Sequence, residues 1–271
     1  MSSSDRGVVL ITGASSGIGK ATAYAFQQAG YRVFGTSRKV VNDVVDGVTM
    51  LICDVTDELS VQSMVAEVLT QAGRIDLLIN NAGIGLLGGA EESSITQAQA
   101  LFDVNVFGVI RVTNAVLPTM RKQQQGRIIN MSSILGLIPS PYNALYSSTK
   151  HAIEGYSESL DHELRTLGVR VVLVEPGLTR TAFEDSIIRP DRTIDLYDSV
   201  RHDMELLMRQ GVKAGDAPEI VANTVLKAAR AAVPKRRYTA GKLSTQVSFL
   251  RRFFPEAMVD KNLRKFNKLP V

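Results

Sequence analysis

Tyr146 and Lys150 are the two residues of this 271-residue chain whose types and spacing point most directly to chemistry. If the segment between them is helical, four residues rise about 6 Å and turn slightly past one full turn, so the phenol and the ammonium share one face. A tyrosine beside a fixed cation is an acid/base pair. In isolation the same spacing also describes a solvated helix face, and motifs elsewhere in the chain have to decide between the two interpretations.

The proton chemistry of such a pair follows from its electrostatics. A free phenol has a pKa near 10, so proton exchange near neutral pH requires the pKa to fall by about 3. A cation at about 4 Å, with an effective dielectric constant of about 20, supplies about 4 kcal/mol, which is the required amount. We therefore expect Lys150 to lower the pKa of Tyr146. Tyr146 then donates a proton to a developing alkoxide, or removes one from an alcohol.

A glycine-rich turn follows the first apolar run, with the sequence Thr12-Gly13-Ala14-Ser15-Ser16-Gly17-Ile18-Gly19. Glycines let the backbone approach a phosphate closely, and a helix N-terminus offers free N–H groups with partial positive charge. The spacing G-x-x-x-G-x-G is a variant of the more common dinucleotide fingerprint G-x-G-x-x-G. Its position between a strand and a helix predicts nucleotide binding, and a tight turn without a ligand is the alternative.

The end of the next apolar run indicates which dinucleotide binds. An acidic residue about 20 positions beyond the glycines bonds the ribose 2′-hydroxyl of NAD. Here the chain reads Phe34-Gly35-Thr36-Ser37-Arg38-Lys39, without a carboxylate, and a cation favours the 2′-phosphate of NADP. We predict NADP (NADPH) over NAD, and assign the phosphate to Arg38 with help from Ser37 or Lys39. The alternative for Arg38 is a solvated strand end.

The apolar pattern supplies the scaffold that these residues need. Short runs typical of buried parallel strands occur at 8–11, 31–36, 48–53, 75–79, 127–131 and 169–174. Helical patterns lie between and after them, at 18–29, 57–72, 96–122, 143–167 and 217–232. The alternation predicts an α/β fold, a single-domain Rossmann-like doubly wound parallel sheet with helices on both faces. The motifs follow strand ends, which is where ligands bind in such sheets.

Together these motifs resemble the short-chain dehydrogenase/reductase family, in its shorter non-extended branch, over about residues 7–180. Within it the chain is most similar to hydroxysteroid- and retinol-dehydrogenase-like members. The resemblance implies a catalytic tetrad of Asn105, Ser133, Tyr146 and Lys150. It also implies a dinucleotide site formed by Gly13, Ser15, Ser16, Gly17, Ile18, Gly19, Ser37, Arg38, Asp54, Val55, Asn81, Ala82, Gly83, Tyr146, Lys150, Pro176, Gly177, Thr179 and Thr181.

The resemblance implies roles for these residues as well. Asp54-Val55 lies along the adenine, and Asn80-Asn81-Ala82-Gly83 closes the fourth strand and lines the cofactor. The segment from Pro176 contacts the nicotinamide end. Lys150 bonds the nicotinamide ribose, and Asn105 holds a water that links Lys150 to solvent.

Several of these motifs also have structural alternatives. Asp54 could cap the helix predicted at 57–72, and Asn105 could satisfy backbone groups within its own helix. Asn80-Asn81 could simply shape a turn.

The expected reaction is hydride transfer between the nicotinamide C4 and a carbonyl or alcohol carbon, with Ser133 orienting the substrate oxygen. Apolar walls predict a lipophilic ketone, aldehyde or alcohol. The expected wall residues are Leu86, Leu87, Ile134, Leu135, Leu137, Ile138, Tyr142, Leu178 and Phe183. A dinucleotide-binding regulator without turnover is the alternative function, although a pure sensor needs none of Ser133, Tyr146 and Lys150.

Length and composition limit the number of domains, the cellular location and the metal content that we expect. We expect one domain over 1–271, with a substrate-loop insertion at about 178–215 that could act as a mobile lid. No run of about 18 apolar residues occurs, so no membrane-spanning helix is expected. Cys53 is the single cysteine, expected to pack as a small hydrophobe, and a reducing, cytoplasmic location fits. The three histidines lack metal-ligand spacing, and no metal is predicted.

The C-terminal segment from Lys235 to Val271 is basic, with ten Lys and Arg against two Asp and Glu. Its charges alternate with apolar residues, as in Phe249-Leu250-Arg251-Arg252-Phe253-Phe254. Packing on its own domain is favoured. Contact with a membrane surface is an alternative, and nucleic acid is not expected. The resemblance also implies a homo-dimer or homo-tetramer, with the 96–122 and 143–167 helices between subunits.

Overall fold

The computed structural model describes residues 6–39 and 44–267. Within these ranges a sheet of eight strands forms the centre, in the spatial order β10-β8-β7-β5-β1-β2-β4-β3. The strands are β1 (Val8–Ile11), β2 (Arg32–Ser37), β3 (Val44–Val45), β4 (Val48–Ile52), β5 (Leu77–Asn80), β7 (Gly126–Met131), β8 (Val169–Pro176) and β10 (Arg237–Ala240). All neighbouring pairs are parallel except β3 and β4 at one edge. The predicted α/β fold with a mostly parallel sheet is confirmed.

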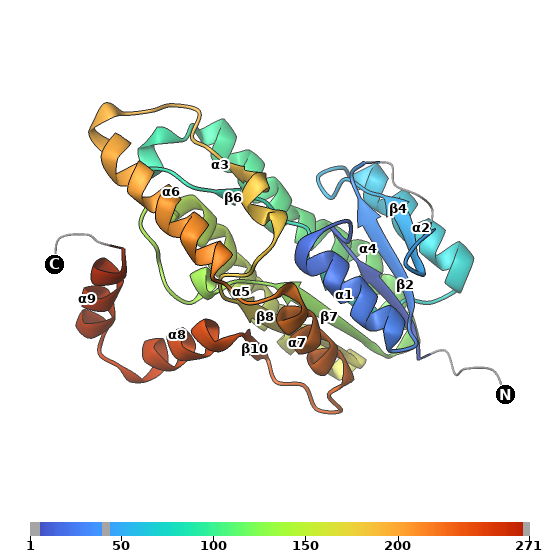
Figure 1. Cartoon of the computed structure of the whole chain (residues 1–271). Coiled ribbons are helices and arrows are strands. Elements are labelled where there is room, and N and C mark those ends of the chain that lie inside the picture. Colours follow the sequence, from blue (N-terminus) through green and yellow to red (C-terminus); the bar gives the residue numbers. More distant parts are fainter. Residues whose placement is uncertain (1–5, 40–43, 268–271) are drawn as a thin grey trace.

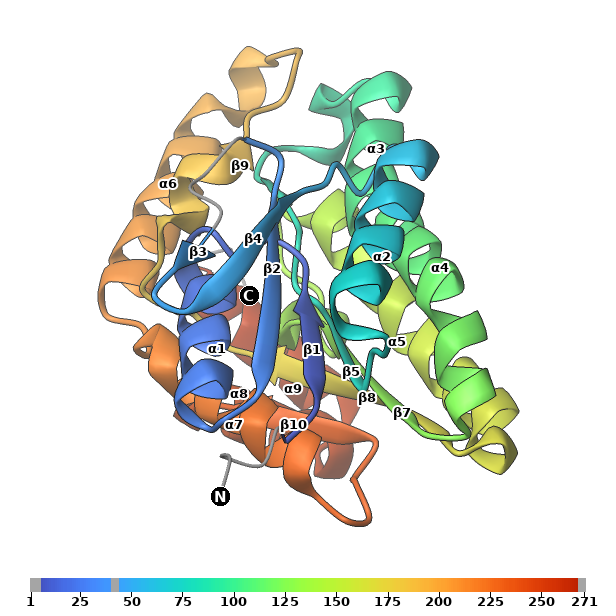
Figure 2. The same cartoon turned by 90° about the vertical axis from the view of Figure 1, so that its right-hand side faces the viewer.

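Helices cover both faces of the sheet (Figures 1 and 2). The helices of the predicted scaffold are α1 (Gly17–Gln28), α2 (Glu58–Ala72), α3 (Ile95–Phe102), α4 (Gly108–Gln123), α5 (Ala144–Leu164) and α7 (Pro218–Arg230). Along β1, Val8 and Leu10 join a core with α2, α4 and α5, whereas Val9 and Ile11 join a second core with α1 and α7. Successive strand residues point to opposite faces, which explains why these runs are apolar throughout.

The helix predicted at 96–122 is interrupted. A π-helical segment, Asp103–Phe107, separates α3 from α4 and carries Asn105. The whole stretch Ile95–Gln123 is long and apolar enough to cross a membrane by length and composition, which differs from the expectation that no helix could do so. Val112, Val116 and Met120 are fully buried against the sheet, as expected for a core helix of a globular domain.

The two segments that break the predicted alternation contain regular structure. The insertion at 178–215 holds the short strand β9 (Ile187–Ile188), which pairs with β6 (Gly85–Leu86), and the helix α6 (Asp198–Lys213). The basic segment contributes strand β10, which pairs with β8, and then two helices, α8 (Lys242–Phe253) and α9 (Glu256–Phe266). We call residues 242–267 the C-terminal arm. It stands at one end of the molecule (Figure 1).

Candidate active site

The predicted site residues gather at one cavity of about 1260 Å³ along the carboxyl ends of the strands. All of them except Asn105 line this cavity. The glycine turn follows β1, Ser37 ends β2, Asn81 follows β5, and Ser133 lies just beyond β7. The parallel strand order places these strand ends next to one another.

The glycine turn adopts the backbone that its sequence requires. Gly13 and Gly17 have φ angles of +67° and +53°, in the left-handed region that favours glycine. A Cβ added at Gly19 would lie 2.1 Å from the Gly13 carbonyl oxygen. Helix α1 begins at Gly17, without an acidic residue in its first turn and without a side-chain cap from Ser16. The close backbone and the uncapped helix N-terminus fit a dinucleotide phosphate.

Asn81 holds this turn in place from the neighbouring strand. Its side-chain nitrogen donates to the carbonyl oxygens of Thr12 and Gly13, both at 3.0 Å. The Thr12 hydroxyl in turn accepts from the backbone N–H groups of Asn81 and Ala82, also at 3.0 Å. Asn80 is buried within β5 and donates to Thr113 and Asn130, so the pair does more than shape a turn.

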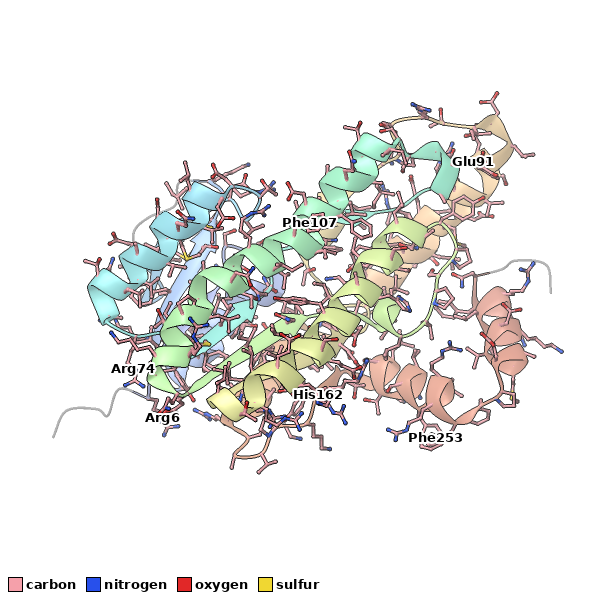
Figure 3. The ribbon with its side chains drawn as sticks, turned by 180° about the vertical axis from the view of Figure 1, so that it is seen from behind. Arg6, Arg74, Glu91, Phe107, His162 and Phe253 are labelled. Carbon is pink, nitrogen blue, oxygen red and sulfur yellow. The ribbon has the colours of Figure 1, made fainter. Side chains whose placement is uncertain are left out.

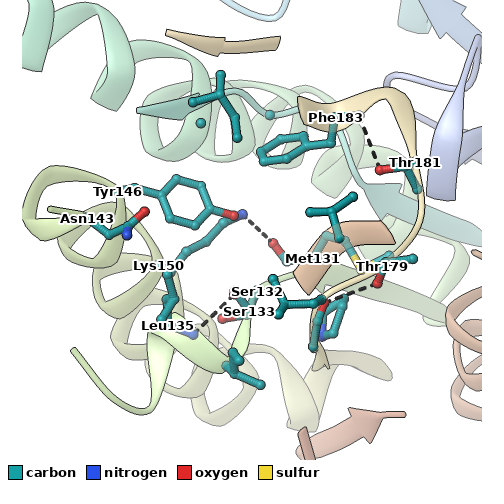
Figure 4. A pocket seen from close by; sticks show the side chains of 18 of the residues that line it. Met131, Ser132, Ser133, Leu135, Asn143, Tyr146, Lys150, Thr179, Thr181 and Phe183 are labelled. Atoms are coloured by element: carbon teal, nitrogen blue, oxygen red, sulfur yellow. Dashed lines mark hydrogen bonds between the residues drawn. The ribbon is translucent and has the colours of Figure 1, made fainter. Parts of the chain in front are cut away.

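Tyr146 and Lys150 lie on the same face of α5, in the arrangement that their spacing predicts (Figure 4). The Lys150 ammonium lies 5.6 Å from the centre of the Tyr146 ring. It donates a hydrogen bond of 2.9 Å to the carbonyl oxygen of Met131, at the end of β7. Phe183, with its ring centre 6.2 Å from that of Tyr146, lies on the opposite side of the cavity.

The electrostatics of this pair differ from the expectation. Burial raises the pKa of the Tyr146 phenol, and a hydrogen bond with Ser133 opposes the rise. Burial also lowers the pKa of Lys150 to about 8, against the opposing effect of Glu154. The expectation that Lys150 brings the pKa of Tyr146 close to neutrality is therefore wrong for the chain by itself. The physical reason is that removing the phenol from water disfavours its charged form.

Ser133 is held beside the phenol by the first turn after β7. Its hydroxyl oxygen accepts from the backbone N–H of Leu135 at 3.1 Å. This leaves the hydroxyl hydrogen for Tyr146 or a substrate oxygen.

Asn105 lies behind the cavity wall and does not face the cavity. Its side-chain oxygen accepts from the Ile84 N–H at 2.9 Å, and its nitrogen donates to the Ile84 carbonyl at 2.8 Å. The amide thus fixes the strand that follows Gly83, rather than backbone of its own helix. Its assignment as the holder of a water next to Lys150 stays a prediction. The π-helical turn around it is a feature that often marks functional sites.

The far end of the cavity carries the residues assigned to the adenosine part of a dinucleotide. Arg38 is exposed at the end of β2. Asp54 accepts from the backbone N–H and the hydroxyl of Thr56 at 2.9 and 2.7 Å, and these hydrogen bonds lower the pKa of its carboxyl. The alternative role of Asp54 as a helix cap is wrong, because Asp57 caps α2 through the N–H groups of Leu59 and Ser60.

The segment after β8 closes the cavity over the glycine turn. The hydroxyl of Thr179 donates to the Gly177 carbonyl at 3.1 Å, and the hydroxyl of Thr181 accepts from the Phe183 N–H at 3.2 Å. A Cβ on Gly17 would lie 3.2 Å from the Cβ of Thr181. The first residues of the 178–215 insertion therefore lie directly against the glycine turn.

Two of the nine residues expected to form the substrate wall, Leu137 and Tyr142, do not line the cavity, so their assignment is wrong. Leu137 ends the short turn Ile134–Gly136. Tyr142 has a φ angle of +60° and packs its ring against Tyr197, with 6.1 Å between ring centres. The other seven expected residues do line the cavity: Leu86, Leu87, Ile134, Leu135, Ile138, Leu178 and Phe183.

A large part of the apolar wall was missed from the sequence. It comes from α6 and from the C-terminal arm, and consists of Met204, Leu207, Met208, Val212, Leu243, Val247, Leu250, Phe254, Met258, Val259, Leu263 and Phe266. The amphipathic pattern of 198–213 and the apolar residues of the basic segment were the available signals. Neither pattern indicates that the two segments meet over the same cavity.

The described part of the chain contains no candidate metal centre. Residues 6–39 and 44–267 contain no group of three or more His, Cys, Asp or Glu side chains placed to hold a metal ion. Cys53 is buried, and burial raises the pKa of its thiol to about 11, as expected for a cysteine that packs as a small hydrophobe.

Comparison with known proteins agrees with this geometry. Residues 7–191 match the short chain dehydrogenase family. The chain is 38% identical over 264 residues to a 3-ketodihydrosphingosine reductase of Bacteroides thetaiotaomicron, covering 96% of this chain and 97% of the relative. Among solved structures, a short-chain dehydrogenase from Streptomyces avermitilis has a TM-score of 0.84 at 32% identity, covering 99% and 98% of the two chains. A family member from Burkholderia phymatum in complex with NAD has a TM-score of 0.78 at 26% identity, covering 93% and 94%.

Proposed function

Because this chain belongs to the short-chain dehydrogenase family of oxidoreductases, we propose that it is an NADPH-dependent reductase of a ketone or aldehyde on a long apolar chain. The observation that carries the proposal is the convergence of Tyr146, Ser133 and Lys150 on the cavity that also contains the glycine turn. A sensor that only binds a dinucleotide has no use for a phenol, a hydroxyl and a buried ammonium at that place.

The nicotinamide, when bound, supplies the hydride, and the protein residues handle the proton. Ser133 has a hydroxyl hydrogen available to orient the carbonyl oxygen. Tyr146 donates its proton to that oxygen as negative charge develops on it. Burial raises the pKa of Tyr146, so the phenol holds its proton at neutral pH, which is the form that reduction requires. Lys150, fixed by the Met131 carbonyl, stabilises the phenolate that remains.

Arg38 supports NADPH as the dinucleotide. It lines the cavity at the end of β2, where a carboxylate would bind the ribose hydroxyls of NAD. A guanidinium there pairs with a 2′-phosphate. The Burkholderia phymatum protein carries NAD, so similarity of fold does not decide the cofactor, and the proposal rests on the charge at this position.

The size and composition of the cavity support a long apolar substrate. Its volume of about 1260 Å³ exceeds the usual range of about 300–1,000 Å³ for a single small ligand, leaving room for a dinucleotide and a second molecule. Beyond Tyr146 the wall is formed by Leu, Val, Met and Phe side chains of α6 and the arm. The Bacteroides thetaiotaomicron relative is named for the reduction of a ketone on a long-chain base, which belongs to the same substrate class.

Tyr146→Phe tests the reaction. We expect carbonyl reduction to fall by about 10²–10⁴-fold, because the general acid is removed while the ring stays in place. NADPH binding, followed by quenching or transfer of its fluorescence, should stay within about twofold. Tyr24→Phe, which removes an exposed phenol outside the cavity, is the matched control. Turnover retained in Tyr146→Phe would refute the assigned role.

Arg38→Ala tests the cofactor. Losing a charged hydrogen bond to the 2′-phosphate should weaken NADPH about 10–100-fold and leave NADH nearly unchanged. Equal effects on the two dinucleotides would contradict the preference.

A homo-dimer or homo-tetramer and a cytoplasmic location are part of the same proposal. They draw on the family resemblance and on the single buried cysteine, respectively.

A further inference from the structure

The C-terminal arm has two different sides. One side lines the substrate cavity with residues such as Leu250 and Leu263. The other side carries Phe249 and Phe253, which do not line the cavity and are 57% and 63% exposed. The ring centres of these two residues are 4.9 Å apart, and Phe254 lies 6.2 Å from Phe249. Exposed phenylalanines in contact with each other form an apolar patch that a protein surface seldom leaves in water.

The arm is attached to the domain at its first turn and extends outward from there. The Ser244 hydroxyl donates to the Glu175 carbonyl at 2.5 Å, and Leu243 lines the cavity. Farther along, α9 has no buried residue. Figure 3 shows Phe253 at the far side of the arm, away from the sheet. Phe249 and Phe253 therefore lie on the outer side of the arm, whose inner side lines the cavity.

The arm that carries this patch is basic. Residues 242–267 contain six Lys and Arg against two Asp and Glu. The Arg252 guanidinium lies 5.6 Å from the centre of the Phe253 ring, so a cation and an apolar group are presented side by side. Aromatic residues next to basic residues on an amphipathic helix are typical of segments that lie in the surface of an anionic bilayer. Each Lys or Arg near such a surface adds to the attraction.

We propose that the outer side of the C-terminal arm docks on an anionic lipid surface, with Phe249 and Phe253 inserted among the lipids and Arg252 at the headgroups. A second copy of this chain is a poorer occupant, because two arms with the same excess of positive charge repel each other. Nucleic acid would use the cations and leave the phenylalanines in water. If the proposed function holds, an apolar substrate reaches the cavity through the same wall without crossing water.

Vesicle flotation of the full chain tests the docking. The wild type should bind phosphatidylcholine vesicles that contain phosphatidylglycerol, bind pure phosphatidylcholine much less, and dissociate as salt is raised. Phe249→Ser combined with Phe253→Ser should reduce binding at least about tenfold. Leu59→Ser combined with Ile95→Ser removes two exposed apolar side chains elsewhere and should bind like the wild type. Turnover of a short water-soluble aldehyde should be equal in all three proteins, which shows that each is folded.

Four outcomes would overturn the docking. The first is equal vesicle binding by the Phe249/Phe253 variant and the wild type. The second is the absence of any preference for the anionic vesicles. The third is binding to duplex DNA that the phenylalanine substitutions leave unchanged. The fourth is a wild type that does not bind vesicles together with a Phe249/Phe253 variant that forms a smaller oligomer than the wild type on light scattering, which would assign the patch to a second copy. Failure of the aldehyde assay in the wild type would instead contradict the proposed function and leave the docking result valid.

Discussion

At the scale of single residues, the acid/base pair is one part of a buried chain of charges along α5. Glu154 lies one turn beyond Lys150 and is almost fully buried. Burial raises the pKa of its carboxyl to about 7, while Arg237 acts in the opposite direction. Arg237 forms an ion pair with Glu154 and with Glu175, and a hydrogen bond with Ser132 also acts to lower the pKa of Glu154. The loss of hydration on burial outweighs these contacts, which is why the pKa of the carboxyl rises.

Glu154 gives a prediction about stability and pH. A carboxyl whose pKa rises from 4.5 to about 7 on folding binds its proton more tightly in the folded protein, so its contribution to stability falls as pH rises through that interval. Glu154→Gln removes this loss. The free energy of unfolding of the variant minus that of the wild type should therefore increase by about 2–3 kcal/mol as the pH rises from 5 to 8. Urea titrations at the two pH values measure it.

Glu158→Gln is the matched control for that experiment. Glu158 pairs with the same Arg237 at 3.1 Å, but from a more exposed position. Its substitution reports the loss of one ion pair to Arg237 without the burial of Glu154. A difference between Glu154→Gln and the wild type that is the same at both pH values would contradict the assigned cause.

At the scale of elements, the glycine turn depends on three segments that are far apart in the chain. The turn after β1 provides the backbone, Asn81 after β5 holds its carbonyls, and Thr181 after β8 covers Gly17. Gly19 has no room for a side chain, because an added Cβ would also lie 2.5 Å from the Asn81 amide nitrogen. A side chain at this position has to displace the turn or the asparagine that supports it.

Gly19→Ala therefore should lose the cofactor. We expect NADPH affinity to fall by at least about 100-fold, together with a loss of stability of about 1–3 kcal/mol from overpacking. Gly155→Ala is the control within a helix, because a Cβ there meets no atom within 4 Å. It should stabilise the protein by about 0.5–1 kcal/mol through helix propensity. Isothermal titration and chemical denaturation measure both effects, and wild-type NADPH affinity in Gly19→Ala would rule out the steric argument.

At the scale of the whole molecule, the cavity joins segments from most of the described chain. The two cores on either side of the sheet share every central strand, and the cofactor site is built at the ends of these strands. The 178–215 insertion and the C-terminal arm then complete the wall for the substrate. Binding of a dinucleotide should therefore stabilise the domain as one unit.

Thermal unfolding measures this coupling. At about 100 times its Kd, NADPH should add about 2.7 kcal/mol to the free energy of unfolding. For a domain of this size that corresponds to a rise in Tm of about 5–10 °C. Tyr146→Phe should show the same rise, because the site for the dinucleotide is intact. A melt in which NADPH shifts only one of two separate transitions would show that the site and the sheet do not unfold together.

The sequence by itself determined the fold class, the positions of the central strands, the glycine turn and the common face of Tyr146 and Lys150. These features depend on short-range rules, namely the alternation of apolar runs, the steric freedom of glycine and the helical repeat. The residues at the strand ends that line the cofactor side of the cavity followed too, because parallel strands bring their carboxyl ends to one edge.

Only the tertiary structure decided which distant segments complete the site and how water is excluded from it. The pairing of β10 with β8, the support of Asn105 for Ile84, and the meeting of α6 with the C-terminal arm join residues that no local pattern connects. The direction of the pKa change at Tyr146 was reversed for the same reason. Burial depends on everything that surrounds a side chain, whereas helical spacing depends only on its neighbours in the chain.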